Sequence, residues 1–86
     1  MYDVKLSRQA LKDYEKLKQG SLLKKAGQLV ELLKQNPFQS PPAFEKLSRD
    51  LKGYFSRRIN VQHRLVYSVD KDAKIVVITS MWTYYE

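Results

Sequence analysis

The sequence predicts an α+β domain with the element order β-α-α-β-β-β, in which two N-terminal helices pack on a mainly antiparallel, twisted sheet. Residues 7–35 carry apolar side chains at the spacing of amphipathic helices, whereas the C-terminal third alternates apolar and polar residues and is rich in β-branched and aromatic ones. With 86 residues, 43% of them hydrophobic, the chain has room for one core. We therefore expect residues 1–86 to form a single domain.

The first expected elements are a short strand and a helix. Residues 2–6 alternate between apolar and polar side chains, as a strand does. Ser7 is suited to cap a helix over residues 7–19, because its hydroxyl oxygen accepts a hydrogen bond from a backbone N–H of the first turn. Gly20 ends this helix, whose apolar face is expected to comprise Ala10, Leu11, Tyr14 and Leu17.

A second helix is expected to run from Ser21, as its cap, to residue 35. Its apolar positions recur at helical spacing and are Leu22, Ala26, Leu29 and Leu33. Pro37 ends it, since the residue before a proline disfavours helical geometry. Two adjacent amphipathic helices are expected to pack together as a hairpin.

The remainder of the chain is expected to be an irregular stretch followed by three strands. The stretch from residue 37 to residue 52 contains Pro41-Pro42 and shows no clear periodicity. Strands are expected at residues 53–60, 62–69 and 74–85, with a turn at residues 70–73.

Composition excludes several classes of function. The net charge of +7 favours a polyanionic partner, through contacts with phosphate groups. The absence of cysteine and the presence of one histidine argue against a metal site, and the three isolated glycines form no phosphate-binding loop, so no cofactor is expected. Because no signal peptide is visible and the longest apolar run spans only residues 75–78, we expect a cytoplasmic protein with no membrane contact.

The most informative stretch is residues 45–67, where basic residues outnumber acidic ones and alternate with aromatic residues. Its basic residues are Lys46, Arg49, Lys52, Arg57, Arg58 and Arg64. If Phe55, Ile59, Leu65 and Val69 face the helices, strand alternation places Arg58 and Arg64 together on the open face of the sheet. Two guanidinium groups there could clamp a phosphate, although an ordinary solvated polar face fits the same pattern.

Several short motifs, taken in order, resemble the YoeB branch of the RelE toxin superfamily. They are Pro37-Phe38, Glu45-x-Leu47, Leu51-x-Gly53, Ser56-Arg57-Arg58-Ile59 and His63-Arg64-Leu65-Val66-Tyr67. The resemblance extends over nearly the whole chain, and its most specific part is the ordered set from Glu45 to Tyr67. It implies an RNase-like fold that cleaves messenger RNA in the ribosomal A site without a metal ion.

The resemblance also implies roles for individual residues. Glu45 matches the glutamate that takes a proton from a ribose 2′-hydroxyl, and Arg64 matches the arginine that stabilises charge on the scissile phosphate. Arg58 matches a second basic contact to the RNA. Further RNA contacts are expected from Lys46, Arg49, Arg57 and Tyr85.

The chain departs from the YoeB pattern at its C-terminus and at residue 48. YoeB proteins place a histidine and then a tyrosine near the C-terminus, where this chain has Tyr84-Tyr85. We therefore expect Tyr84 to stand in the position of the general acid, although a phenol with a pKa near about 10 is a poor acid at neutral pH. His63 is an alternative acid, but strand alternation turns it away from Arg64. Ser48 replaces a usual lysine, for which Lys46 or Arg49 could compensate.

The partners that the resemblance implies are a cognate antitoxin, messenger RNA and the bacterial ribosome, at the A site of the small subunit. Operator DNA is expected as a partner only of the toxin–antitoxin complex, and a homodimer is left open. Two other interpretations fit the basic charge equally well. One is a non-enzymatic nucleic-acid-binding protein or antitoxin co-repressor of the same fold, and the other is a small interaction domain whose basic face binds an acidic protein.

Overall fold

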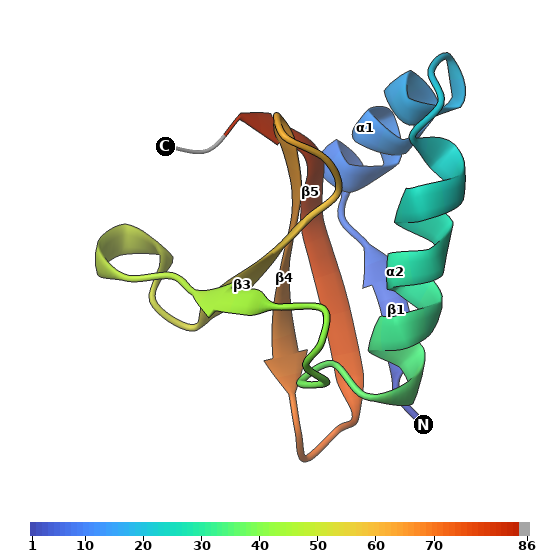
Figure 1. Ribbon diagram of the computed structural model, residues 1–86. Coiled ribbons are helices and arrows are strands. Elements are labelled where there is room, and N and C mark those ends of the chain that lie inside the picture. Colours follow the sequence, from blue (N-terminus) through green and yellow to red (C-terminus); the bar gives the residue numbers. More distant parts are fainter. Residues whose placement is uncertain (85–86) are drawn as a thin grey trace.

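The fold is built on one five-stranded sheet, with both α-helices on the same side of it (Figure 1). The computed structural model describes residues 1–84, apart from the side chains of Arg49 and residues 82–84. In chain order the elements are β1 (Asp3–Leu6), α1 (Arg8–Lys18), α2 (Leu23–Gln35), β2 (Phe44–Lys46), a 3₁₀ helix (Arg49–Leu51), β3 (Tyr54–Arg58), β4 (His63–Asp70) and β5 (Ile75–Tyr84). This arrangement confirms the predicted α+β class.

The sheet has the strand order β1-β5-β4-β3-β2. β1 pairs with β5 in parallel, and all the other neighbours are antiparallel. The first and last strands of the chain therefore lie side by side, and all the other elements of the fold lie between them in the sequence. The prediction of a mainly antiparallel sheet is confirmed.

The capping prediction is confirmed for α1 and wrong for α2. The Ser7 hydroxyl accepts a hydrogen bond from the backbone N–H of Ala10 at 3.1 Å and donates one to the carbonyl of Thr79 at 2.9 Å. It thereby caps α1 and ties the start of the helix to β5. α2 begins after Leu22, without a side-chain cap, so Ser21 does not have the predicted role.

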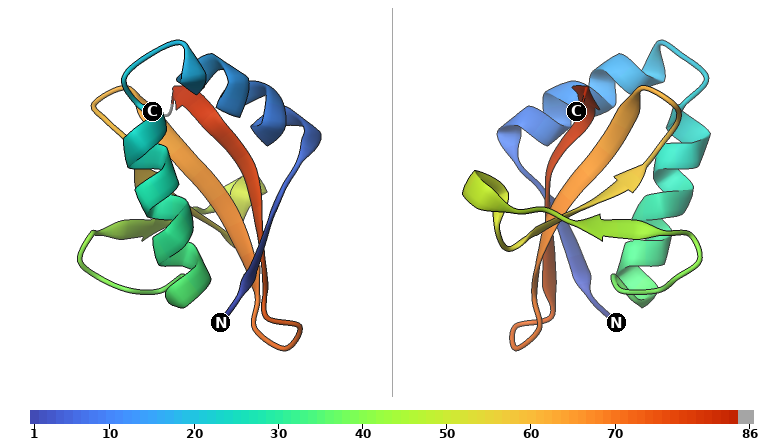
Figure 2. Two further views of the ribbon diagram at one scale, coloured as in Figure 1. Left: turned by 90° about the vertical axis from the view of Figure 1, so that its right-hand side faces the viewer. Right: turned by 60° about the vertical axis from the view of Figure 1, so that its left-hand side comes forward.

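The two helices do not pack as the predicted hairpin, because α1 lies mainly against β5 (Figure 2). The buried carboxylate of Asp13 accepts a hydrogen bond from the backbone N–H of Met81 at 2.9 Å, which draws this face of α1 onto the sheet. Leu11, predicted to be part of the apolar face, is instead 54% exposed. Neither α-helix in residues 1–84 is long and apolar enough to cross a membrane.

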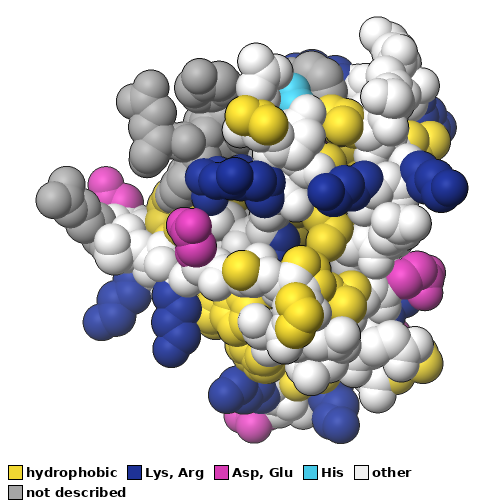
Figure 3. All heavy atoms as spheres, viewed as in Figure 1, with side chains coloured by type: hydrophobic (Ala, Val, Ile, Leu, Met, Phe, Trp, Pro, Cys, Tyr) yellow, Lys and Arg dark blue, Asp and Glu magenta, His cyan; other side chains and the backbone are white. Residues whose placement is uncertain are grey.

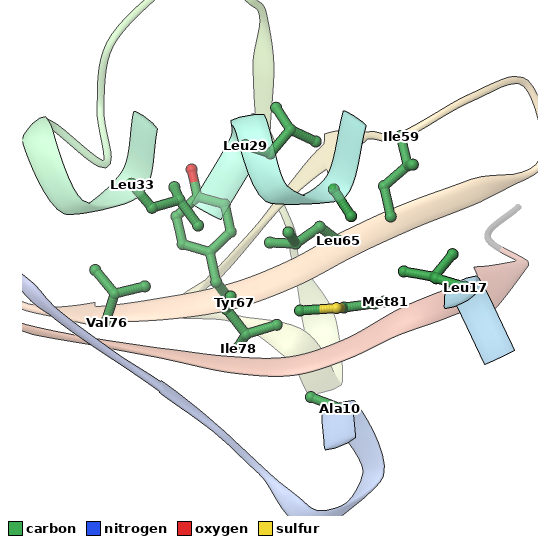
Figure 4. Close-up of a cluster of buried hydrophobic side chains, with 11 residues drawn as sticks. Ala10, Leu17, Leu29, Leu33, Ile59, Leu65, Tyr67, Val76, Ile78 and Met81 are labelled. Atoms are coloured by element: carbon green, nitrogen blue, oxygen red, sulfur yellow. The ribbon is translucent and has the colours of Figure 1, made fainter. Parts of the chain in front are cut away.

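The core lies between α2 and the central strands (Figure 4). Leu29 and Leu33 of α2 come close to Leu65 and Tyr67 of β4, and all four are buried. The remaining buried members of the cluster are Ala10, Leu17, Ala26, Ile59, Val76, Ile78 and Met81. The prediction that Ile59 and Leu65 face the helices is confirmed, and Phe55 and Val69 pack against the same cluster.

The segment predicted to be irregular contains the short edge strand β2. It pairs with β3 in the register Phe44↔Arg57, Glu45↔Ser56 and Lys46↔Phe55. Three residues are too few for alternation to reveal a strand in the sequence. The loop before β2 contains two cis peptide bonds, Ser40–Pro41 and Pro41–Pro42.

Candidate active site

Strand pairing brings together three of the predicted site residues. Arg58 of β3 lies directly opposite Arg64 of β4. The Glu45 carboxylate on β2 lies 3.5 Å from a guanidinium nitrogen of Arg64, measured from Oε2 to Nη1. The edge strand β2 therefore places the Glu45 carboxylate beside Arg64, in a cavity that Arg58 also lines.

These residues line a cavity of about 580 Å³, which lies within the usual size range of ligand sites. The lining residues are Lys25, Gln28, Leu29, Leu32, Pro42, Ala43, Glu45, Ser56, Arg58 and Arg64. Arg58 and Arg64 share one strand face, as predicted, but four of the lining residues belong to α2, which the sequence did not predict. The helix forms one wall of the site.

The electrostatics of the cavity favour an anion. Arg64 is 19% exposed in its side chain, whereas Glu45 is 66% exposed, so water screens the carboxylate more than the guanidinium. Arg58 is exposed and, among the described residues, has no carboxylate partner. Basic side chains are also spread over the face seen in Figure 3, where acidic ones are fewer. The single carboxylate of Glu45 does not neutralise the two guanidinium groups. A phosphate that enters the cavity could therefore accept hydrogen bonds from both Arg58 and Arg64.

Ser56, which the sequence analysis missed, lies on the same strand face as Arg58. It is opposite Glu45 in the β2–β3 pair, a position at which Cβ atoms are about 5 Å apart. Ser56 is 1% exposed, and its hydroxyl has no hydrogen-bond partner in the described part of the chain. A buried donor of this kind at the lining of a cavity is suited to a polar ligand.

Arg57 is buried, whereas a residue that contacts RNA must be accessible at the surface. It is 1% exposed, and its guanidinium donates hydrogen bonds to the backbone carbonyls of Pro37, Gln39 and Pro42 at 3.0, 2.8 and 2.8 Å. Its Nε donates to the Tyr67 hydroxyl at 3.2 Å. This burial contradicts the prediction that Arg57 binds RNA. The residue instead holds the loop that leads into β2, and so supports the strand that carries Glu45.

Tyr67 completes this buried arrangement. Its hydroxyl donates to the Pro37 carbonyl at 2.9 Å while it accepts from Arg57. Burial raises the pKa of Tyr67 above its ordinary value of 10.0, and the nearby Arg57 charge and hydrogen bond only partly oppose this. The phenol therefore stays neutral at physiological pH and acts as both a donor and an acceptor.

Lys46, another predicted RNA contact, does not line the cavity. Lys46 lies next to Glu45 on β2 and so points to the other face of the strand, where it lines a second cavity with Leu47, Ser48, Lys52, Gly53, Tyr54 and Phe55. The backbone of Arg49 lies in the 3₁₀ helix that follows β2. Its side chain is outside the described part of the structure.

At the C-terminal end of β5 the backbone passes next to the site. Tyr84 pairs with His63 and Thr83 pairs with Arg64, so the predicted general acid lies on the strand adjacent to the key arginine. The side chain of Tyr84 is not among those described, and Tyr85 lies outside the described residues altogether. His63 is half-buried and does not line the cavity.

Comparison with known proteins identifies relatives over most of the chain. The family model described as the YoeB-like toxin of bacterial type II toxin–antitoxin systems matches residues 6–84. Toxin YoeB of Synechocystis sp. is 43% identical over 56 residues, which are 64% of this chain and 65% of that protein. Toxin YoeB of Escherichia coli K12 is 36% identical over 55 residues, which are 64% of this chain and 66% of that protein. In both cases the matched region spans just under two thirds of the relative's length.

Solved structures share the whole fold. A YoeB/ParE toxin from Agrobacterium tumefaciens superposes with a TM-score of 0.87 at 27% identity, covering 96% of this chain and 99% of that one. YoeB from Staphylococcus aureus, in a heterotetrameric complex with YefM, gives a TM-score of 0.82 at 35% identity and covers 99% of both chains. The same toxin, solved as a dimer, gives 0.81 at 35% identity over 98% of both chains.

Proposed function

Because the chain belongs to the YoeB-like toxins of bacterial type II toxin–antitoxin systems, we propose that it is an endoribonuclease that cleaves messenger RNA in the ribosomal A site. The observation that carries this proposal is the Glu45 carboxylate 3.5 Å from Arg64, with Arg58 opposite Arg64, in one cavity. A base beside phosphate-binding cations is the minimum that cleavage by an RNA's own 2′-hydroxyl needs.

In the proposed reaction Glu45 takes the proton of a ribose 2′-hydroxyl. The 2′-oxygen attacks the adjacent phosphorus, and the bond to the 5′-oxygen of the next nucleotide breaks. Arg58 and Arg64 stabilise the negative charge that develops on the phosphoryl oxygens. The products are a 2′,3′-cyclic phosphate and a 5′-hydroxyl. The leaving oxygen must gain a proton, for which Tyr84 is the proposed source.

The resting contact between Glu45 and Arg64 has to loosen when RNA binds. The phosphate competes with the carboxylate for the N–H groups of Arg64, and the largely exposed Glu45 gives up little by turning toward the ribose. The ion pair thus holds base and phosphate-binding group close together before substrate arrives.

The site supplies acid–base catalysis and stabilisation of negative charge. Only two surfaces of the protein, α2 and the face of the strands, are available to hold the RNA in shape. In-line attack requires the 2′-oxygen, the phosphorus and the leaving oxygen to be aligned, which flexible RNA seldom achieves. We propose that the ribosome imposes this geometry, since positioning alone can contribute several kcal/mol.

Ribosome dependence provides the test of this function. We expect the purified toxin to cut a translated message about 10³-fold faster than the same RNA free in solution, because only the former is held in the reactive geometry. The measurement is the initial cleavage rate of end-labelled RNA with and without programmed ribosomes. Equal rates would contradict ribosome dependence. Binding to RNA or antitoxin without any cutting would favour the non-enzymatic interpretation.

The proposed protein partner is an antitoxin, as in the Staphylococcus aureus complex of YoeB with YefM. A dimer like that of the same toxin is a second proposed assembly. We propose a cytoplasmic location, where both the ribosome and an antitoxin are available.

A further inference from the structure

One face of α2 lines the same cavity as the proposed catalytic residues. Lys25, Gln28, Leu29 and Leu32 follow one another at the i, i+3, i+4 and i+7 positions of a single helical stripe. Leu29 is buried and Leu32 half-buried, whereas Lys25 and Gln28 are more exposed. The C-terminal part of this stripe is therefore apolar and packs toward the sheet, whereas its N-terminal part is polar and faces the cavity.

Lys25 lies where its charge is locally unfavourable for the helix. It is in the first turn of α2, which contains no acidic residue, next to Lys24. Cations near a helix N-terminus are disfavoured by the helix dipole, and anions are favoured there. None of the ion pairs among the described residues includes Lys25.

The cavity itself provides the independent evidence for a polar, anionic ligand. Its lining includes the side chains of Lys25, Arg58 and Arg64 against the single carboxylate of Glu45. The buried hydroxyl of Ser56, which has no partner in the described part of the chain, belongs to the sheet wall of the same cavity. The two walls thus offer donors and positive charge to one occupant.

We propose that Lys25 binds a second phosphate of the same RNA strand, next to the phosphate held by Arg58 and Arg64. α2 then forms one side of a short RNA-binding groove and fixes the direction of the strand across the site. This inference rests on the proposed function for the identity of the ligand. It assigns to α2 a substrate contact that lies outside the residues expected from the sequence.

Lys24 offers a matched control for Lys25. Both residues are exposed lysines in the first turn of α2, but only Lys25 lines the cavity. Lys25→Gln and Lys24→Gln remove the same charge, have nearly equal helix propensities and relieve the same unfavourable interaction with the helix dipole. Neither variant is expected to unfold the protein, which thermal unfolding checks.

The binding experiment uses a trinucleotide RNA with 2′-O-methyl groups, which cannot be cleaved by 2′-oxygen attack, titrated into each protein and followed by NMR. We expect Lys25→Gln to weaken binding about five- to tenfold and to lower the slope of log affinity against log salt by about 0.7, the value for one lost phosphate contact. The affinity of Lys24→Gln for the trinucleotide should stay within about twofold of that of the unaltered protein. Lys25→Arg, which keeps the charge, should retain the affinity of the unaltered protein.

Cleavage of translated RNA is measured on the same variants, and the loss for Lys25→Gln is expected in KM more than in kcat. If the unaltered toxin binds the trinucleotide with this Lys25 dependence but cuts nothing, the proposed catalytic function fails and the phosphate contact stands. Equal weakening by the two glutamine variants, no weakening by Lys25→Gln, or no binding by the unaltered protein overturns the Lys25 assignment.

Discussion

Arg64→Ala is expected to lower the rate of cleavage of translated RNA by about 10²- to 10³-fold. The Arg64 guanidinium forms the ion pair with Glu45, and its residue lies opposite Arg58 in the sheet. Its loss removes a donor aimed at charge that appears in the transition state. Single-turnover cleavage on programmed ribosomes measures the effect. Growth arrest after induced expression should be lost in parallel.

The fold of this variant should be intact, because the only ion pair that Arg64 makes in the described structure is with the exposed Glu45. Arg64→Lys is the control that keeps the charge but not the two-pronged geometry, and we expect it to recover only part of the rate. Cleavage by Arg64→Ala at the rate of the unaltered toxin would remove Arg64 from the reaction.

Arg57→Met is expected to lower the free energy of unfolding by about 3 kcal/mol. Methionine can replace the aliphatic stem, but it leaves the Gln39 and Pro42 carbonyls without their donor and the Tyr67 hydroxyl without one of its partners. Each buried polar group that loses its partner costs about 1–3 kcal/mol, less what the loop regains by relaxing toward water. Urea denaturation followed by circular dichroism measures this difference.

The neighbouring Arg58 supplies the matched control for that experiment. Arg58→Met removes the same side chain from the next position of β3, where it is exposed, so its stability should change by no more than about 0.5 kcal/mol. Equal stability losses in the two variants would show that Arg57 is not a special support of the loop.

Arg57 also shows where pattern and chemistry disagree in the sequence. Strand alternation places it on the face of Phe55 and Ile59, which is the buried face. Its charge suggested an RNA contact, and the charge is instead satisfied by loop carbonyls and by the ring of Phe44 at 4.8 Å. The alternation was the better guide, because a side chain's direction in a strand is fixed by the backbone.

Other parts of the site depended on packing that no local pattern contains. Arg58 and Arg64 could be paired from their strands alone, since period-two alternation and a short turn fix their relation. The position of Lys25 at the cavity depends on how α2 packs on the sheet. That packing is set by contacts between residues far apart in sequence, such as those of Leu29 and Leu33 with the central strands (Figure 4).

The same reasoning explains the helical errors. Hydrophobic periodicity placed the ends of both helices to within two residues and put Ala10, Tyr14 and Leu17 of α1 correctly toward the core, but it was wrong for Leu11. Leu11 was placed inside and lies in water, whereas Asp13 is buried because it receives the backbone N–H of Met81. A polar residue that is buried by a hydrogen bond leaves no signal in an apolar pattern.

The most direct test of the proposed chemistry replaces the 2′-hydroxyl at the cleaved position of a translated message by hydrogen. With Glu45 as base and the RNA's own 2′-oxygen as nucleophile, the cut at that nucleotide should disappear while cuts at unmodified codons remain, and the fragments should end in a 2′,3′-cyclic phosphate. Continued cutting at the 2′-deoxy position would mean that another nucleophile attacks the phosphate and that Glu45 does not act as the base for a ribose 2′-hydroxyl.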